Sequence, residues 1–201
     1  MASLRELAGP LSIAYFILAR LTYVFGVGTA LVLEKRRRAF TRAGGVAARF
    51  ARFRRMASAI MNNDAIAFVV MSWFTRGTLV LQVPRWLAVA AGVIGIAAGI
   101  GIKLWARSGV GPTGYYWYDF FDPAARAPET PRGPYRYLDN PMYTVGYLHA
   151  YGFAILVESL PGLILAAFAQ LAILGFYLIV ERPHFRALSE KKEGPARGTL
   201  Q

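Results

Sequence analysis

The sequence of 201 residues contains no cysteine and only two histidines, His149 and His184. Without cysteine the chain has no disulfide, no thiolate nucleophile and no cysteine-ligated metal. Two histidines are also too few for a histidine-rich metal site, so we expect no bound metal. Acidic residues are scarce as well, because 11 Asp and Glu stand against 23 Lys and Arg, and the net charge is +12.

Charged residues of both signs make up only 17% of the chain, while 56% of the residues are hydrophobic and the mean hydropathy is +0.38. This composition is too apolar for an ordinary soluble domain and is typical of a small polytopic membrane protein. The sequence therefore predicts an all-α, polytopic transmembrane helix bundle that forms a single integral membrane domain over residues 1–201, with no Rossmann domain.

Five apolar segments are candidates for membrane spans, since a span needs about twenty mostly apolar residues. We expect the first to be an uncleaved helix, because it is too long for the core of a signal peptide. The last two flank a short turn and predict a C-terminal helical hairpin. The segments are 8–33, 65–83, 86–105, 141–157 and 163–180. Asn62, Asn63 and Asp64 are plausible capping residues for the second.

Positive charge is concentrated in residues 34–55, which hold nine Lys and Arg against one Glu and so carry +8 of the net charge. Arginines at helical spacing in its second half indicate an amphipathic helix at the membrane surface. The excess of Lys and Arg places this loop in the cytoplasm. Nucleic-acid binding is the alternative for so basic a segment, but the rest of the chain is membrane-like, so we expect no nucleic acid.

Counting five spans from a cytoplasmic loop 34–55 brings a polar loop at 106–140 and the C-terminal tail to the same side of the membrane. Two polar clusters therefore share one face. They are Arg-Tyr-Leu-Asp-Asn-Pro-Met-Tyr at 136–143 and Glu-Arg-Pro-His at 181–184. Residues 186–201 are expected to form a flexible tail.

Asn140 and Pro141 have the form of a helix start, with Asn as the N-cap and Pro at the first helical position. The free N–H groups of such a first turn can hold a carboxylate or a phosphate, although a capped helix without a ligand is the simpler alternative. Glu181 directly follows an apolar run. A carboxylate near a helix C-terminus lies at the unfavourable end of the helix dipole, so a partner cation would explain its position.

Two further features bear on a site. Glycines at 109–114 precede an aromatic stretch at 115–121. The glycines allow the backbone to approach a ligand closely, and the aromatic faces suit a cation. The simpler alternative is a flexible turn followed by an aromatic belt at the membrane interface. Arg20 lies in the middle of the first span, where a charge costs several kcal/mol on insertion scales. Arg20 should therefore face the bundle interior, either in contact with a lipid phosphate or paired with an acid or with carbonyls.

Together these residues resemble the membrane phospholipid N-methyltransferases, that is, the phosphatidylethanolamine N-methyltransferase family, which is related to the isoprenylcysteine carboxyl methyltransferases. The resemblance covers about 109–185 and rests on Gly-Pro-Tyr-Arg-Tyr-Leu-Asp-Asn-Pro-Met-Tyr at 133–143, the hairpin, and Glu-Arg-Pro-His at 181–184. It implies S-adenosylmethionine as methyl donor and S-adenosylhomocysteine as product. The donor would bind within 106–185, in a pocket that faces the cytoplasm.

The resemblance also assigns residues. Gly111 and Gly114 match the glycine segment of the family, with Gly99 and Gly101 as a rival assignment. Glu181 matches the first acid of a Glu-Glu pair whose second position is Arg182 here, a departure from the pattern. The expected donor-binding residues are Gly111, Gly114, Tyr118, Arg136, Tyr137, Asn140, Pro141, Tyr143, Glu181, Arg182 and Pro183. The expected lipid-binding residues are Arg20, Tyr116 and Trp117.

The implied reaction is methyl transfer to the amine head group of phosphatidylethanolamine, or of its methylated forms, toward phosphatidylcholine. The attacking amine must first lose a proton, and the candidate bases Asp119, Asp139, Glu181 and His184 are not distinguished by the sequence. The expected partners are a membrane lipid and the bilayer. The alternatives are a membrane methyltransferase for a thiol or a prenylcysteine carboxylate, and a non-enzymatic membrane scaffold or transporter.

Overall fold

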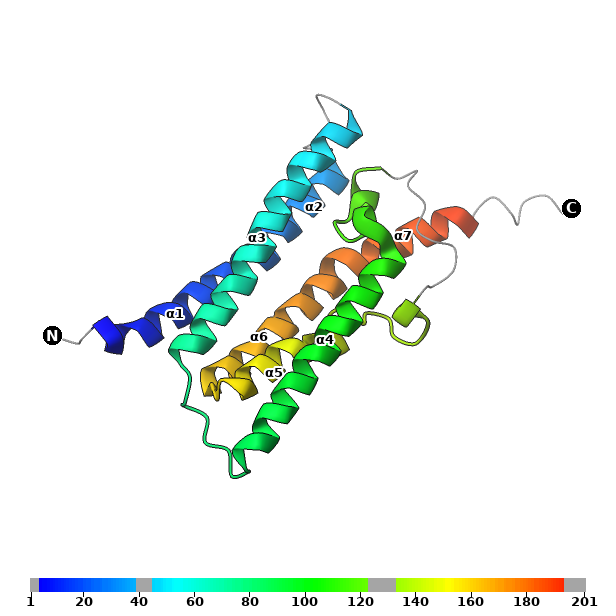
Figure 1. The fold of residues 1–201 in the computed structure, drawn as a ribbon. Coiled ribbons are helices and arrows are strands. Elements are labelled where there is room, and N and C mark those ends of the chain that lie inside the picture. The colour runs from blue at the N-terminus through cyan, green and yellow to red at the C-terminus, as the bar shows by residue number, and fades with distance from the viewer. Residues whose placement is uncertain (1–3, 39–44, 123–132, 194–201) are drawn as a thin grey trace, which may run out of the picture.

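The computed structural model describes residues 4–38, 45–122 and 133–193, and these fold into a bundle of helices (Figure 1). The described residues contain no strand, so the predicted all-α architecture without a Rossmann domain is confirmed. The helices are α1 Leu4–Leu21, α2 Gly28–Arg37, α3 Val46–Phe74, α4 Arg85–Gly114, α5 Leu148–Leu156, α6 Leu160–Phe176 and α7 Arg182–Glu193. Single-turn 3₁₀ helices are η2 Tyr118–Phe120, η3 Gly133–Arg136 and η4 Val145–Tyr147, and π-helical segments are η1 Thr22–Val27 and η5 Tyr177–Glu181.

Three continuous helical stretches in the described part of the chain are long and apolar enough to cross a membrane, and they are Leu7–Arg37, Arg85–Gly111 and Leu160–Glu190. They correspond to the first, third and fifth predicted spans. A shorter apolar helix, Val145–Leu156, stands where the fourth was predicted. Its α-helical part, α5, has nine residues and reaches only about 14 Å, less than the ~30 Å of a hydrocarbon core.

The second predicted span corresponds to α3, which is not among these three stretches and has other boundaries than expected. The basic amphipathic helix is simply the beginning of α3, so most of the predicted loop 34–55 is helical, and residues 39–44 within it lie outside the described residues. Asp64, predicted as a capping residue, lies in the middle of α3 and is buried. At its other end α3 stops at Phe74 instead of continuing to 83.

The early end of α3 has a local cause. The hydroxyl of Thr75 donates to the Met71 carbonyl at 2.8 Å, and Gly77 then adopts a positive φ of 73° that other residues rarely adopt. From there the chain runs along the α5–α6 turn, where the Gly77 N–H donates to the carbonyl of Val157 at 3.2 Å. The apolar residues that follow are therefore paired with a turn rather than wound into a helix.

The loop predicted from 106 onward is also partly helical. α4 continues to Gly114, with a kink at Gly111, where φ is 73°. Similarly, α7 extends through the first part of the expected flexible tail as far as Glu193, and residues 194–201 lie outside the described residues. The C-terminal hairpin is confirmed: Ser159 caps α6 by accepting the N–H of Gly162 at 2.9 Å.

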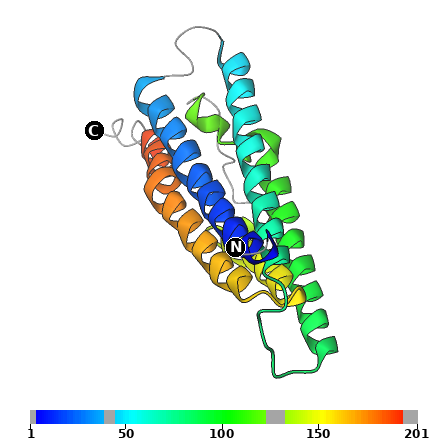
Figure 2. The ribbon, with the colours of Figure 1, turned by 90° about the vertical axis from the view of Figure 1, so that its left-hand side faces the viewer.

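Both polar clusters lie at one end of the bundle. Figures 1 and 2 show α2, the beginning of α3, the C-terminal part of α4 and α7 gathered there, while the connection between α3 and α4 lies at the opposite end. The basic residues of α2 and α3 are at the same end as the clusters. The arrangement expected from counting charges and spans is therefore found. That this end faces the cytoplasm stays a prediction.

Candidate active site

The turn at Asn140 is capped as the sequence predicts, but it does not begin an α-helix. The Asn140 side-chain oxygen accepts the N–H of Tyr143 at 3.1 Å, and its carbonyl accepts the N–H and the hydroxyl of Thr144 at 3.1 and 2.7 Å. The chain then passes through η4, and α5 starts only at Leu148. The cap thus fixes Tyr143 within a tight turn.

Glu181 lies inside a continuous helix rather than at a helix C-terminus, because η5 leads directly into α7. The side chain is buried, with 5% of its surface exposed. One carboxylate oxygen, Oε1, accepts both the Trp117 indole N–H and the Tyr143 hydroxyl, each at 2.7 Å. These bonds join the two clusters that the sequence singles out, together with the aromatic stretch.

The two donors to Glu181 are held firmly. Trp117 has a positive φ of 58°, a sparsely populated conformation for a residue of its size, and its ring packs against Phe53 and Phe176. The pKa of the Tyr143 phenol is raised well above its usual value, mainly by burial and secondly by the negative charge of Glu181. The phenol therefore stays protonated and acts as a donor.

A cavity of about 420 Å³ opens beside this junction. Near Trp117 and Tyr143 its wall is aromatic, and Tyr23, Tyr115 and Tyr116 complete that part. Farther along α3 the wall carries charged and polar groups, and it ends among apolar side chains. The remaining lining residues include Arg20, Ser58, Met61, Asp64, Phe68, Val69, Ile100, Lys103, Tyr147 and His149.

Arg20 faces the bundle interior, as predicted, and pairs with an acid. One of its terminal nitrogens, Nη2, lies 2.6 Å from the Asp64 carboxylate, and the other, Nη1, donates to the Tyr147 hydroxyl at 3.0 Å. The rings of Phe16 and Tyr23 lie within 6 Å of the guanidinium. The pairing with an acid, one of the two alternatives for this residue, is therefore found, and a direct contact with lipid phosphate stays a prediction.

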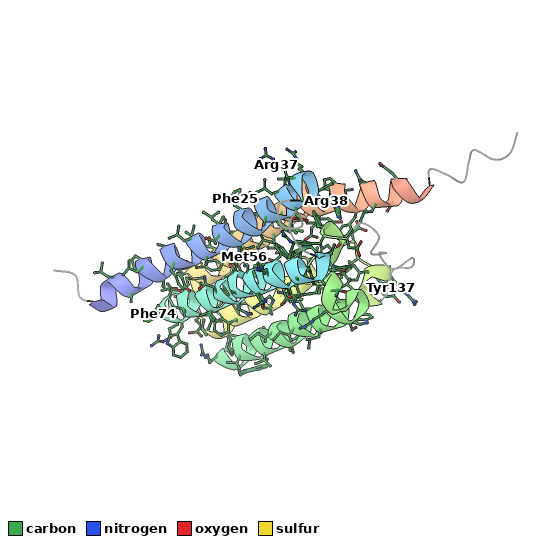
Figure 3. All side chains as sticks on the ribbon, turned by 90° about the horizontal axis from the view of Figure 1, so that it is seen from above. Phe25, Arg37, Arg38, Met56, Phe74 and Tyr137 are labelled. Carbon is green, nitrogen blue, oxygen red and sulfur yellow. The ribbon has the colours of Figure 1, made fainter. Side chains whose placement is uncertain are left out.

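The other predicted residues divide into three groups. Tyr116 lines the cavity, whereas Tyr118 packs against Phe50, with ring centroids 4.8 Å apart. Exposed side chains on the surrounding loops and on α7 are those of Arg136, Tyr137, Asp139, Arg182 and Pro183. Tyr137 lies at the outer edge of the molecule (Figure 3) and is 77% exposed. Pro141 is buried, and Gly111 and Gly114 are not among the residues that line the cavity.

His184 belongs to a second, smaller cavity of about 240 Å³. Its Nε2 lies 2.9 Å from an oxygen of Asp119, and its ring stacks on Phe120 at 3.7 Å. The residues that line this cavity include Glu34, Lys35 and Arg38. Two of the candidate bases therefore lie together, and neither is among the residues that line the larger cavity.

Sequence reasoning missed several residues of the larger cavity. The sequence predicts Asp64 as a cap, and it does not single out Lys103, Tyr147 or His149 as site residues. An isolated acid next to an apolar run, and a lysine two positions before an interfacial tryptophan, were the available signals. Only the packing of the helices reveals that these side chains meet.

Residues 87–191, just over half of the chain, match the family described as phospholipid methyltransferase. The chain belongs to the phospholipid methyltransferase family. The matched segment of the chain runs from the beginning of α4 to α7. It therefore includes the turn at Asn140, the donors Trp117 and Tyr143, and Glu181.

Curated relatives that the chain matches are named phosphatidylethanolamine N-methyltransferase. That of Pyricularia oryzae is 29% identical over 152 residues, which are 74% of this chain and 16% of the relative. That of Scheffersomyces stipitis is 26% identical over 156 residues, 74% of this chain and 18% of the relative. That of Schizosaccharomyces pombe is 30% identical over 136 residues, which are 66% of this chain and 15% of the relative. The chain thus spans less than a fifth of these relatives. No solved structure matches it.

Proposed function

We propose that this protein transfers the methyl group of S-adenosylmethionine to the amine head group of phosphatidylethanolamine, or of its methylated forms, toward phosphatidylcholine. One observation carries the proposal: the buried Glu181 carboxylate joins Trp117 and Tyr143 beside an aromatic cavity, within the segment that matches the family. The names of the relatives support the choice of lipid.

The cavity suits the methyl donor. Its volume of about 420 Å³ lies within the range of small-molecule sites, roughly 300–1,000 Å³. The aromatic faces of Tyr116, Trp117 and Tyr143 attract a cation through the ring quadrupole, and a sulfonium is a cation. When bound there, the donor supplies a methyl group on positively charged sulfur. The residues present therefore fit this cofactor.

The protein's contribution is alignment and exclusion of water. Glu181 holds the Trp117 indole and the Tyr143 phenol in fixed positions at the cavity wall, and the cap at Asn140 holds the backbone of Tyr143. Alignment of two reactants in a dry site can supply several kcal/mol of a reaction barrier. That Glu181 also binds the donor, through a cationic group, stays a prediction.

The lipid enters sideways, between α3 and α4. Val69 of α3 and Ile100 of α4 both line the cavity, yet they are 47% and 44% exposed at the surface of the bundle. Among the described elements, α4 packs mainly against α5 and has no extended contact with α3. An apolar opening at this position lets a head group reach the cavity while the acyl chains stay in the bilayer.

The direct test uses the full chain in lipid nanodiscs that contain phosphatidylethanolamine. We expect radiolabelled methyl from S-adenosylmethionine to appear in the lipid fraction, and calorimetry to detect donor binding. Label in a thiol or a prenylcysteine acceptor, with none in the lipid, would support the related methyltransferases instead. Absence of both donor binding and transfer would overturn the proposal.

Asn140→Ala should reduce lipid methylation at least about tenfold, because misplacement of an aligning group is costly. The substitution leaves the Tyr143 N–H without its side-chain acceptor, which costs about 1 kcal/mol of stability. Asn140→Asp keeps an acceptor oxygen and is the matched control, so it should retain most of the activity. Equal methylation by Asn140→Ala and the unmodified protein would show that this cap does not position the site.

A further inference from the structure

A group of charged side chains in the middle of the cavity has no part in the donor site described above. Asp64 is 5% exposed, and one of its oxygens, Oδ2, pairs with Arg20 at 2.6 Å. The other oxygen, Oδ1, is buried and has no hydrogen-bond partner among the described residues. A buried carboxylate oxygen without a donor is costly unless a ligand supplies one. Asp64 is also the sole acidic residue among those described as lining this cavity.

The cationic side chain of Lys103 lines the same cavity. Lys103 of α4 lies 3.4 Å from Nε2 of His149, while Nδ1 of His149 lies 2.5 Å from the Gly146 carbonyl oxygen. A neutral histidine that donates from Nδ1 to a carbonyl has Nε2 as acceptor, so His149 orients the Lys103 ammonium. Because an ammonium has three donors, Lys103 can bind an anion at the same time.

The position of the pair suits a lipid head group. Lys103 lies two residues before Trp105, an aromatic residue of the kind found at membrane interfaces, so it is placed near phosphate depth. Along α3, Asp64 lies six residues, or about 9 Å, from Ser58, which is 3.4 Å from the Tyr116 hydroxyl at the aromatic part of the cavity. A group bound at Asp64 therefore faces the proposed donor site.

We propose that Asp64 and Lys103 together recognise the zwitterionic head group of the lipid, with Lys103 binding the phosphate and Asp64 Oδ1 binding the ammonium and accepting its proton. The inference rests on the proposed function and adds the recognition of the acceptor to it. Arg20 is a positioning residue, because its bond to Asp64 Oδ2 leaves Oδ1 directed to the ligand.

The proton balance is simple. A lipid R–NH₃⁺ gives one proton to the Asp64 carboxylate, which leaves R–NH₂ and a neutral carboxylic acid. The nitrogen lone pair then forms the new N–CH₃ bond as the bond between sulfur and the methyl group breaks, and sulfur keeps that electron pair. The product is R–NH₂CH₃⁺, and Asp64 then releases its own proton to solvent. The protons that remain on the product nitrogen allow Asp64 to act as the base again.

The test measures kinetics in nanodiscs with dioleoyl-phosphatidylethanolamine, together with donor affinity by calorimetry. Asp64→Asn should lower kcat/KM for lipid about 100-fold or more, within the range lost with a general base, while the donor Kd changes less than about twofold. Lys103→Gln should raise the lipid KM about tenfold with kcat nearly unchanged, and Lys103→Arg should restore it. The kcat of the unmodified protein should rise with pH as the base ionises, and this rise should be absent in Asp64→Asn.

Glu158→Gln is the matched control, because it also converts a carboxylate to an amide but lies at the α5–α6 turn, paired with Arg85. It should leave both kinetic constants unchanged. Asp64→Asn kinetics equal to those of this control would overturn the proposal. If Asp64→Asn does not fold, an unchanged lipid KM in Lys103→Gln would overturn it. Failure of the unmodified protein to bind the donor is a different result, because it contradicts the proposed function itself.

Discussion

Replacement of Glu181 by glutamine is expected to lower kcat/KM for lipid methylation about 100-fold, equivalent to ~2.7 kcal/mol of barrier, in a protein that remains folded. The carboxylate accepts two charge-assisted hydrogen bonds, from Trp117 and Tyr143, and such bonds are roughly twice as strong as neutral ones. Glutamine removes the charge and brings two N–H donors into a buried position. The walls of the proposed donor site would then lose their fixed geometry.

The measurement compares Glu181→Gln with Glu190→Gln, which removes the charge of an exposed glutamate farther along the same helical stretch. Methyl transfer, donor affinity by calorimetry and thermal unfolding are determined for both variants. Glu190→Gln should behave as the unmodified protein does. Full activity in Glu181→Gln, with unchanged donor affinity, would remove Glu181 from the site.

Substitution of Gly99 by alanine should have the largest effect on stability. A Cβ at this position would collide with the backbone N of His149 and lie 2.9 Å from the Gly146 carbonyl oxygen, so α4 and α5 would have to separate. Overpacking of this kind costs about 3 kcal/mol. Because α4 and α5 carry Lys103 and His149, we expect a lower thermal midpoint and loss of lipid methylation together.

Gly101→Ala is the control, since a Cβ at position 101 meets no atom within 4 Å. Alanine is the better helix former by about 1 kcal/mol, so the thermal midpoint should stay the same or rise. This pair also tests the rival glycine assignment. If Gly101→Ala stays folded but loses donor binding, Gly101 contacts the donor. A thermal midpoint of Gly99→Ala equal to that of Gly101→Ala would contradict the close packing of α4 on α5.

The meeting of the two polar clusters could be predicted because it depends on features that a sequence shows directly. The excess of Lys and Arg in 34–55 predicts on which side of the membrane this loop lies, and each predicted span reverses the direction of the chain. The charge of this loop and the number of spans together predict that Asn140 and Glu181 lie at one end of the bundle. In the structure Tyr143 forms hydrogen bonds with both residues. The capping role of Asn140 followed from residue type, since its side chain competes well for a free N–H.

The other parts of the fold and of the site could not be predicted, because they depend on contacts between residues that lie far apart in the sequence. Residues 75–83 belong to the second predicted span, yet the N–H groups of Gly77 and Leu79 donate to the carbonyls of Val157 and Glu158 in the α5–α6 turn. The sequence predicts a capping role for Asp64, whereas in the structure α1 packs on α3 and Arg20 pairs with Asp64. Trp117 has a positive φ that its residue type disfavours, and its contacts with Glu181, Phe53 and Phe176 are all long-range.

We propose that this member of the phospholipid methyltransferase family acts on the amine of a membrane lipid. Mass spectrometry of lipids tests this proposal in a host that makes no phosphatidylcholine, with and without expression of the full chain. We predict methylated forms of phosphatidylethanolamine only in expressing cells, and none when Glu181→Gln is expressed at the same level. An unchanged lipid profile in cells that contain the folded, donor-binding protein would show that the protein does not methylate phosphatidylethanolamine.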